Sequence, residues 1–503
     1  MPLDKTHYVN LKNGQFDSTT RLQMATLFQT FAASPARDNL IVYFHGGLVG
    51  EAAGMATAER LLPVFESSGG YPVFFVWESG LIDAIKNNLG EIAGERIFQL
   101  LLKKVGQFVS GKVKQALDLG TRGPQLELPT ESEVALELAK AGGPEMPFGD
   151  LDWTAVLPGE ELLATEQRQF EDAFSRDRDI DAEARRIANS FRTAADIQAD
   201  LDSRGVTVRG SSQTLMSPSV IEEIRQAAGA DADGQTRGLI TSGFLLKHAV
   251  SLLKRIVVRF ARRRAHGVYA TIVEEILREL YVANVGEFIW TQIKKDTADA
   301  FQDPATQYGG SAFLQETKAM WEAGRRPRIT LMGHSTGAVY ICNLLMQAQQ
   351  RLPADVKFDV VFLAPACTHS LFSAALAAAG GRIDHFRMFT MSDGKEQADS
   401  MVPAVRLLYP HSLLYFVSGV VEKEADCPIV GMERFYSGAP PFDPAKIPDV
   451  DAVRTFVTAD PARVVWSISD SGPGRASAAT SHSDFGKEAN TLESLKHLIS
   501  RGF

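Results

Sequence analysis

The sequence predicts an α/β protein in which helices flank a mostly parallel central sheet and a large helical insertion interrupts the chain. Two observations support this prediction. Short apolar runs rich in β-branched and aromatic residues recur along the chain, and helix-forming segments separate several of them, as parallel pairing requires. Between residues 81 and 307, charged residues and helix formers replace such runs. The 503 residues, 45% of them hydrophobic, are enough to bury a large core.

The first strand–helix–strand unit is expected near the start of the chain. Buried strands are predicted at 39–44 and 72–77, because each run is almost wholly apolar and ends at turn residues, His45-Gly-Gly and Glu78-Ser-Gly. The alanine-rich segment 51–65 between them carries apolar residues at helical spacing. Further strands are expected at 328–332, 358–364, 385–391 and 463–469.

The expected domains are a core made of residues 1–80 and 308–503 and a mainly helical insertion at 81–307. The role of the insertion is open between a cap over a site, a partner-binding region and an oligomer contact. Segment 243–266 within it mixes apolar positions with lysines and arginines, which argue against a membrane span. Such a basic amphipathic helix suits packing against neighbouring helices, and the alternative is peripheral contact with an anionic membrane.

Charge and cysteine content exclude several classes of function. The chain has 52 basic and 61 acidic residues, a net charge of −9, so it has no global basic footprint for nucleic acid. Cys342, Cys367 and Cys427 make an odd count without metal-ligand spacing, which favours neither disulfides nor a structural metal. The first residues lack the pattern of a secretory signal. A cytoplasmic, reducing location is therefore expected.

The motif that carries chemistry is Gly333-His-Ser-Thr-Gly337, which follows the strand predicted at 328–332. Glycines two residues before and after Ser335 allow a sharp strand-to-helix turn that holds the serine hydroxyl at the carboxyl end of the strand. The motif is weak alone, but Ala338 to Gln347 supplies the helix that should follow it. Ser335 is thus the predicted nucleophile, and a buried structural turn is the alternative.

A serine hydroxyl needs a base to remove its proton, and the base needs an acid to orient it. His482, in Ala-Thr-Ser-His-Ser-Asp-Phe-Gly, lies on a polar loop after the strand predicted to end at Ser469. Such a loop can carry an imidazole over Ser335. We therefore predict His482 as the base, against the alternative of a solvated surface histidine.

Two aspartates are candidates for the acid. Asp393 directly follows the strand predicted to end at Met391, and Asp399 lies a few residues further along the same loop, in Ala-Asp-Ser-Met-Val-Pro. That sequence resembles the Asp-x-Val-Pro turn in which many serine lipases carry their acid, with one extra residue. Asp399 is the predicted acid, Asp393 the alternative, and a solvated structural carboxylate the remaining interpretation.

The oxyanion of a tetrahedral intermediate needs hydrogen-bond donors. The turn His45-Gly-Gly-Leu ends a predicted buried strand, and its glycines let main-chain N–H groups approach a substrate oxygen. The predicted donors are the N–H groups of Gly47 or Leu48 together with that of Thr336. A plain glycine turn is the alternative.

The order His-Gly-Gly, Gly-His-Ser-Thr-Gly, an aspartate after a strand and a late histidine resembles the α/β-hydrolase superfamily. The resemblance covers residues 1–80 and 308–503. It implies a mostly parallel sheet, a Ser–Asp–His order of catalytic residues and ester, amide or thioester substrates. The chain departs from the usual pattern because its insertion precedes the nucleophile strand, whereas lids in this superfamily often follow the strand after the nucleophile helix.

The expected function is a serine hydrolase that cleaves carboxyl esters, of lipids or of other small molecules with hydrophobic acyl groups, through an acyl-enzyme. No cofactor and no metal are expected. An amidase or peptidase is also compatible with the residues. The alternative from another class is a non-catalytic protein that keeps this scaffold and binds a partner through its insertion.

Four further residues have a structural interpretation. His334 is expected to pack beside the sheet, and His411 to cap or pack against an apolar segment. His369 is interpreted as a pocket or packing residue, and Cys342 as a small core residue behind the nucleophile.

Overall fold

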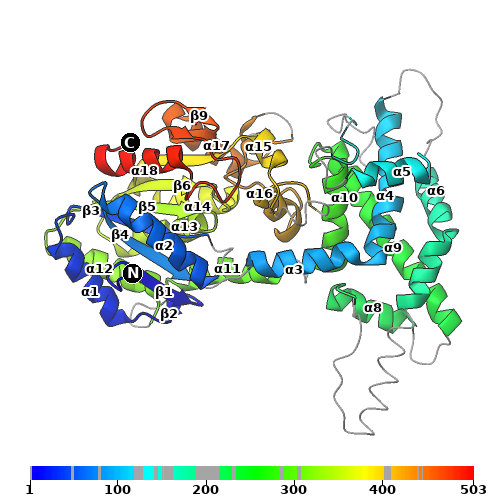
Figure 1. The fold of residues 1–503 in the computed structure, drawn as a ribbon, viewed down its shortest axis with the longest axis horizontal. Helices are drawn as coiled ribbons and strands as arrows, with labels where there is room; N and C mark the ends of the chain where they lie inside the picture. The colour runs from blue at the N-terminus through cyan, green and yellow to red at the C-terminus, as the bar shows by residue number, and fades with distance from the viewer. Residues whose placement is uncertain are drawn as a thin grey trace, which may run out of the picture.

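The computed structural model of the chain describes the following residues: 3–46, 50–77, 81–117, 129–140, 146–149, 151, 162–187, 214–228, 234–282, 287–302, 307–401, 409–438, 441–443 and 446–503. Their main feature is an eight-stranded sheet in the order β2-β1-β4-β3-β5-β6-β7-β8 (Figure 1). Strand β1 pairs antiparallel with β2, and every other pair in this sheet is parallel. The prediction of an α/β fold with a mostly parallel sheet is confirmed. The strands are β1 (Tyr8–Lys12), β2 (Gln15–Phe16), β3 (Asn39–Phe44), β4 (Tyr71–Trp77), β5 (Arg328–His334), β6 (Phe358–Leu363), β7 (Ile383–Met391) and β8 (Val464–Ser467).

The central strands are apolar on both sides because helices cover both faces of the sheet. In β3, Leu40, Val42 and Phe44 belong to one hydrophobic cluster, and Ile41 and Tyr43 belong to another. Alternate residues of a strand point to opposite faces, so an uninterrupted apolar run is what a strand buried on both faces requires.

Two groups of helices form these layers. Residues of α2 and α18 fill the cluster that contains Ile41, and residues of the other helices fill the cluster that contains Leu40. A short hairpin of β9 and β10 follows β8. The helices are α1 (Arg21–Ala33), α2 (Glu51–Glu66), α12 (Gly309–Glu322), α13 (Gly337–Arg351), α14 (His369–Ala379), α17 (Pro448–Thr458) and α18 (Ala489–Arg501), and the hairpin strands are β9 (Ser469–Asp470) and β10 (Ala476–Ser477).

A helical region lies between β4 and β5 in the sequence and beside the sheet in space (Figure 1). Helices α3 and α11 link it to the sheet, and α11 contacts α13 through a hydrogen bond from Asn343 to Thr297. The helices are α3 (Leu81–Gly94), α4 (Arg96–Leu117), α5 (Glu131–Ala139), α6 (Ala164–Ser175), α8 (Pro218–Ala228), α9 (Gly234–Ala261), α10 (Val268–Ile276), η1 (Leu277–Tyr281) and α11 (Glu287–Asp299).

The segment after β7 belongs to the same hydrophobic core as the insertion. Tyr409, Leu413, Phe416, Met432 and Phe435 are buried in one cluster with residues of α4, α9 and α10. We call the insertion together with residues 409–438 the helical body. It is therefore built from two chain segments. The elements of the second segment are α16 (Leu413–Phe416), η5 (Val417–Val421) and η6 (Glu433–Tyr436), and the short helix α15 (Asp393–Ala398) lies between β7 and this segment in the sequence.

Segment 243–266 covers most of α9 and the turn after it. Its apolar residues Leu253, Ile256 and Phe260 are buried in the core of the helical body. Three of its arginines form ion pairs within the protein: Arg255 pairs with Glu275 and Glu279, Arg259 with Glu274 and Glu275, and Arg264 with Asp426. These contacts favour the packing interpretation over membrane contact. Among the described residues, no helix combines the length and apolar character needed to cross a bilayer.

A buried network of charges joins the two segments of the helical body. Both ring nitrogens of His266 contact carboxylates, Nδ1 that of Glu274 at 2.8 Å and Nε2 that of Asp426 at 2.9 Å. Arg259 adds an ion pair to Glu274 at 2.7 Å, and the hydroxyl of Tyr409 donates to the same carboxylate at 2.7 Å. Burial opposes ionisation of Glu274, but the charges of His266 and Arg259 overcome that effect and hold its pKa well below the usual range.

Replacement of Glu274 should show how much this network stabilises the protein. In Glu274→Gln, the amide cannot neutralise Arg259 and His266, so we expect the free energy of unfolding to fall by about 3 kcal/mol. Urea denaturation measures the change. The control is Glu131→Gln, which removes an exposed carboxylate paired with Lys103 and Lys104 and should cost under about 1 kcal/mol. Equal losses in both variants would contradict the importance of the buried network.

Candidate active site

Ser335 lies in a tight turn between β5, which ends at His334, and α13, which begins at Gly337. Its φ angle is +54°, in the left-handed region that residues with a side chain rarely occupy. The glycines explain the turn. A Cβ on Gly333 would lie 2.7 Å from the carbonyl carbon of Gly337, and one on Gly337 would lie 2.2 Å from the carbonyl oxygen of Phe44. Helix and strands therefore touch main chain to main chain, and Ser335 takes up the turn.

Strand β6 fixes the turn from the other side. The N–H of Ser335 donates to the carbonyl of Leu363 at 2.9 Å, and the N–H of Ala366 donates to the carbonyl of Ser335 at 3.0 Å. Ser335 is completely buried, and its hydroxyl has no hydrogen-bond partner among the described residues. Buried polar atoms usually have partners, so an unpartnered serine hydroxyl on a strained turn indicates a functional position.

His482 lies beside this turn, in the loop after β10, and its side chain is buried. Both polar groups of its main chain are held by side chains. The N–H donates to Oδ2 of Asp399 at 3.1 Å, and the carbonyl accepts from Nε2 of His334 at 3.1 Å. The rings of His334 and His482 are 5.1 Å apart, centroid to centroid. The structure therefore places Asp399 and His482 in contact, next to the residue that precedes Ser335.

The ring of His482 is available for chemistry. Neither ring nitrogen has a hydrogen-bond partner within the described part of the chain. Burial, together with the nearby ring of His334, holds the pKa of His482 well below its usual value, so the imidazole is neutral. Burial also raises the pKa of Asp399, and the hydrogen bond from the N–H of His482 partly offsets that effect.

Asp393, the alternative acid, is engaged elsewhere. Its Oδ1 accepts from the hydroxyl of Tyr415 and its Oδ2 from the amide of Gln397, both at 2.7 Å. Tyr415 lies on α16, so the carboxylate of Asp393 is hydrogen-bonded to the helical body. The structure thus brings Asp399, and not Asp393, to the main chain of His482.

A third carboxyl group in the same loop, that of Glu396, was not singled out from the sequence. It is completely buried on α15, and neither of its carboxyl oxygens has a hydrogen-bond partner among the described residues. Burial, and then the nearby carboxylates of Asp399 and Asp393, raise its pKa well above the usual value, although the adjacent Ser412 acts in the opposite direction. Glu396 is therefore a neutral acid. Nothing in the sequence around Glu396 indicates that this glutamate is buried, so its environment could not be predicted from the sequence.

Two of the three predicted oxyanion donors, Gly47 and Leu48, lie outside the described residues. Thr336 is buried at the amino-terminal end of α13. The start of this turn does lie next to Ser335, because a Cβ on Gly46 would lie 3.2 Å from the Cβ of Ser335. The adjacency follows from the sheet order, since β3 and β5 are parallel neighbours and end at the same edge.

His45 holds this turn in place as a neutral side chain. Its Nδ1 donates to the carbonyl of Gly46 at 2.7 Å, and its Nε2 accepts from the N–H of Trp77 at 2.9 Å. The ring also stacks on Trp77 with centroids 4.3 Å apart. Burial lowers the pKa of His45 to about 4, so it stays neutral and both hydrogen bonds are kept at ordinary pH.

The remaining residues take structural positions. His369 opens α14, packs against Phe435 and Tyr436, and has a pKa lowered to about 3 by burial. His411 contacts the carbonyls of Gln397 and His266. Cys342 is buried on α13, where burial raises the pKa of its thiol well above the usual value.

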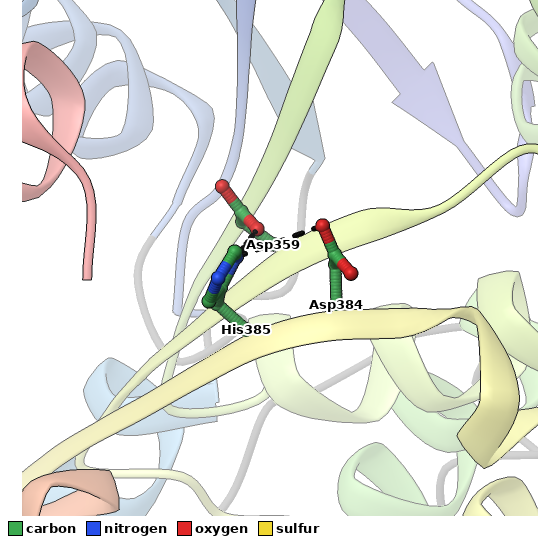
Figure 2. A group of neighbouring side chains, drawn as sticks. All are labelled: Asp359, Asp384 and His385. Carbon is green, nitrogen blue, oxygen red and sulfur yellow. Dashed lines mark hydrogen bonds and ion pairs between the residues drawn. The ribbon is translucent and has the colours of Figure 1, made fainter.

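One group of described residues has the composition of a metal site. Figure 2 shows Asp359, Asp384 and His385, whose ligand atoms lie within 4.8 Å of one another. They stand at the amino ends of β6 and β7, at the edge of the sheet opposite Ser335. Asp359 is already neutralised by Arg328 and accepts from His385 at 2.8 Å, and Arg328 also donates to the carbonyls of Leu498 and Ile499. We interpret the group as a structural cluster of ion pairs and hydrogen bonds that, through Arg328, attaches α18 to the sheet.

Comparisons with protein-family models, curated proteins and solved structures give no match to this chain. The fold and the geometry of the site therefore carry the functional argument.

Because α13 and the strands are in close contact, replacing Gly337 by a residue with a side chain should destabilise the protein. In Gly337→Ala, the new methyl group would meet the Phe44 carbonyl, and we expect the free energy of unfolding to fall by about 3 kcal/mol. Thermal denaturation measures the loss. Gly381→Ala is the control because the added methyl group would meet no atom within 4 Å. If Gly337→Ala were as stable as Gly381→Ala, the turn could accommodate a methyl group at residue 337, and the proposed steric constraint would be wrong.

Proposed function

We propose that this protein is a serine hydrolase that cleaves carboxyl esters. The observation that carries the proposal is Ser335, buried at φ +54° at the carboxyl edge of a parallel sheet, next to a histidine loop whose ring nitrogens are unengaged within the described residues. General-base activation needs an unprotonated base that can reach the serine hydroxyl. Ser335 and the neutral imidazole of His482 both lack partners among the described residues, and the loop of His482 is hydrogen-bonded to the residue before Ser335, which supports the proposed pairing.

In the proposed reaction, the imidazole of His482 removes the proton from Ser335 as its hydroxyl oxygen attacks the ester carbonyl carbon. The tetrahedral intermediate then collapses, and His482 gives the proton to the departing alcohol. A water molecule attacks the acyl-enzyme with His482 again as the base, and the free acid leaves. The low pKa of His482 suits the base role, because the ring is neutral before the reaction begins.

Asp399 is proposed as the acid that orients His482. Its carboxylate accepts from the main-chain N–H of His482, so it lies near the side of the residue from which the ring extends. In the reacting state, Asp399 is proposed to accept a hydrogen bond from Nδ1 of His482 and so to fix the tautomer of the ring. Asp393 is the weaker choice, because Tyr415 and Gln397 occupy both of its oxygens.

The oxyanion donors proposed are the N–H of Thr336 with that of Gly47 or Leu48. Thr336 lies at the amino-terminal end of α13, where the dipole of a long helix favours a negative charge. The contact between Gly46 and Ser335 supports placing the second donor in the turn after β3.

A hydrophobic acyl group is the proposed substrate feature. Ser335 is completely buried, and Met401, two residues after Asp399, packs against the core of the helical body. A reaction centre shielded from water in this way suits an apolar acyl chain better than a strongly hydrated one. The helical body is accordingly proposed as a cap.

Labelling with a fluorophosphonate probe tests the proposed nucleophile. The wild-type protein should react at Ser335, Ser335→Ala should not react, and His482→Ala should react at least about a thousandfold more slowly because the base is lost. The rate should fall with acidification only below the ordinary histidine range, since protonation of His482 removes the base and its pKa is lowered. Mass spectrometry locates the label. A folded wild-type protein that neither labels nor hydrolyses 4-nitrophenyl esters of any chain length would refute the proposal.

The two aspartates can be separated by comparing Asp399→Asn with Asp393→Asn. We expect Asp399→Asn to lower kcat/KM by about three to four orders of magnitude, as loss of an orienting acid does. Asp393→Asn should leave the rate within about tenfold and instead reduce stability by about 1 kcal/mol, because the hydrogen bond from Tyr415 is weakened. Ester hydrolysis and urea denaturation give the two measurements. The reverse pattern would assign the acid to Asp393.

A further inference from the structure

His334 stands between the nucleophile and the loop of the candidate base. It is the last residue of β5, and the residue after it is Ser335. Its Nε2 contacts the main-chain carbonyl of His482 at 3.1 Å, across a separation of 148 residues in the chain. We infer that His334 is a positioning residue, whose imidazole holds the main chain of His482 beside the turn that carries Ser335.

The hydrogen bond fixes the state of the His334 ring. A carbonyl can only accept, so Nε2 carries the proton. Burial lowers the pKa of His334, and Arg60 acts in the same direction, although the hydrogen bond to His482 opposes them. The ring is therefore neutral, with its single N–H committed to His482. Its Nδ1 faces the turn after β3, where a Cβ on Gly46 would lie 2.9 Å away. The turn thus confines the ring from the other side.

His334 and Asp399 together hold one residue at two points. Asp399 accepts from the N–H of His482, and His334 donates to its carbonyl. A residue fixed at both main-chain polar groups can move its ring only by side-chain rotation. The loop is also hydrogen-bonded to the sheet domain on either side of His482, from Arg60 to the carbonyl of Gly486 and from the hydroxyl of Ser467 to the carbonyl of Ala479. Within the loop, Asp484 accepts from the N–H groups of Thr480 and Ser481 and so stiffens it internally.

This arrangement gives His334 a role different from simple packing. A packing residue is replaced best by a side chain of similar shape, whereas a positioning donor is replaced best by another N–H group. Since a base misplaced by about 1 Å can lose about a hundredfold in rate, loss of one anchor should be measurable. The expected loss of rate rests on the proposed function. The hydrogen bond between His334 and His482 is observed in the structure whatever the function.

Two variants of His334 separate these roles. His334→Phe keeps a planar ring and removes the donor, and His334→Gln keeps an N–H donor and removes the ring. We expect fluorophosphonate labelling of Ser335 to be about ten- to a hundredfold slower in His334→Phe than in the wild type. His334→Gln should recover most of that loss. His334→Leu takes the place of His334→Phe if the latter does not fold.

A second measurement does not depend on activity. In the Ser335→Ala background, hydrogen exchange of the peptide spanning residues 478–486 should be about tenfold faster with His334→Phe, because the hydrogen bond that holds the main chain of His482 is lost. Exchange with His334→Gln should stay near the parental rate. Exchange in β6, away from the loop, serves as the internal control.

The outcomes are distinct. Equal labelling and exchange in wild type and His334→Phe would overturn the inference, and so would equal losses in His334→Phe and His334→Gln, which would assign His334 to packing. If the wild-type protein does not label while the exchange pattern is as expected, the anchor stands and the proposed hydrolase function fails.

Discussion

The candidate site depends on one steric constraint, the direct contact of α13 with the main chain of β3 and β5. Gly333 and Gly337 leave no room for a Cβ, so the helix starts immediately against the strands. The chain must reverse direction within two residues, and Ser335 makes this possible by adopting a left-handed backbone conformation with φ +54°. Because neighbouring parallel strands end at the same edge, the turn after β3 and the end of β6 meet this point as well. The serine is therefore placed by main-chain packing rather than by side-chain contacts.

The loop that carries Asp399 is held by both the sheet and the helical body. It leaves the sheet at the end of β7, and from α15 onward its main chain is hydrogen-bonded to residues of the helical body. The carbonyl of Gln397 contacts the ring of His411, whose other nitrogen contacts the carbonyl of His266, and the N–H of Met401 donates to the carbonyl of His411. A shift of the helical body relative to the sheet would thus displace Asp399 while leaving Ser335 in place. The insertion is therefore connected to the candidate site through the helical body, even though it precedes β5 and Ser335 in the sequence.

The sequence predicted those elements of the fold that a short run of neighbouring residues determines. The run at 39–44 coincides with β3, because a strand buried on both faces is a continuous apolar run bounded by turn residues. Strand β1 (Tyr8–Lys12) was not predicted, since a strand near the sheet edge mixes polar and apolar residues in a short stretch. The inclusion of 409–438 in the helical core was also missed, because an apolar run does not say which core it enters. His334 could be read only as packing, since its partner lies 148 residues away.

The three carboxyl groups of the α15 loop differ in how their charge is compensated, and this difference bears on the proposed chemistry. Asp393 has two hydrogen-bond donors, and buried Glu396 stays neutral. Asp399 accepts hydrogen bonds from the main chains of His482 and Ser400, which lower its pKa, but burial outweighs them and raises it. A buried carboxylate that faces a neutral base gains stabilisation when that base becomes positive. If His482 accepts the proton of Ser335, attraction to Asp399 would therefore stabilise the transition state more than the ground state, which is the condition for catalysis.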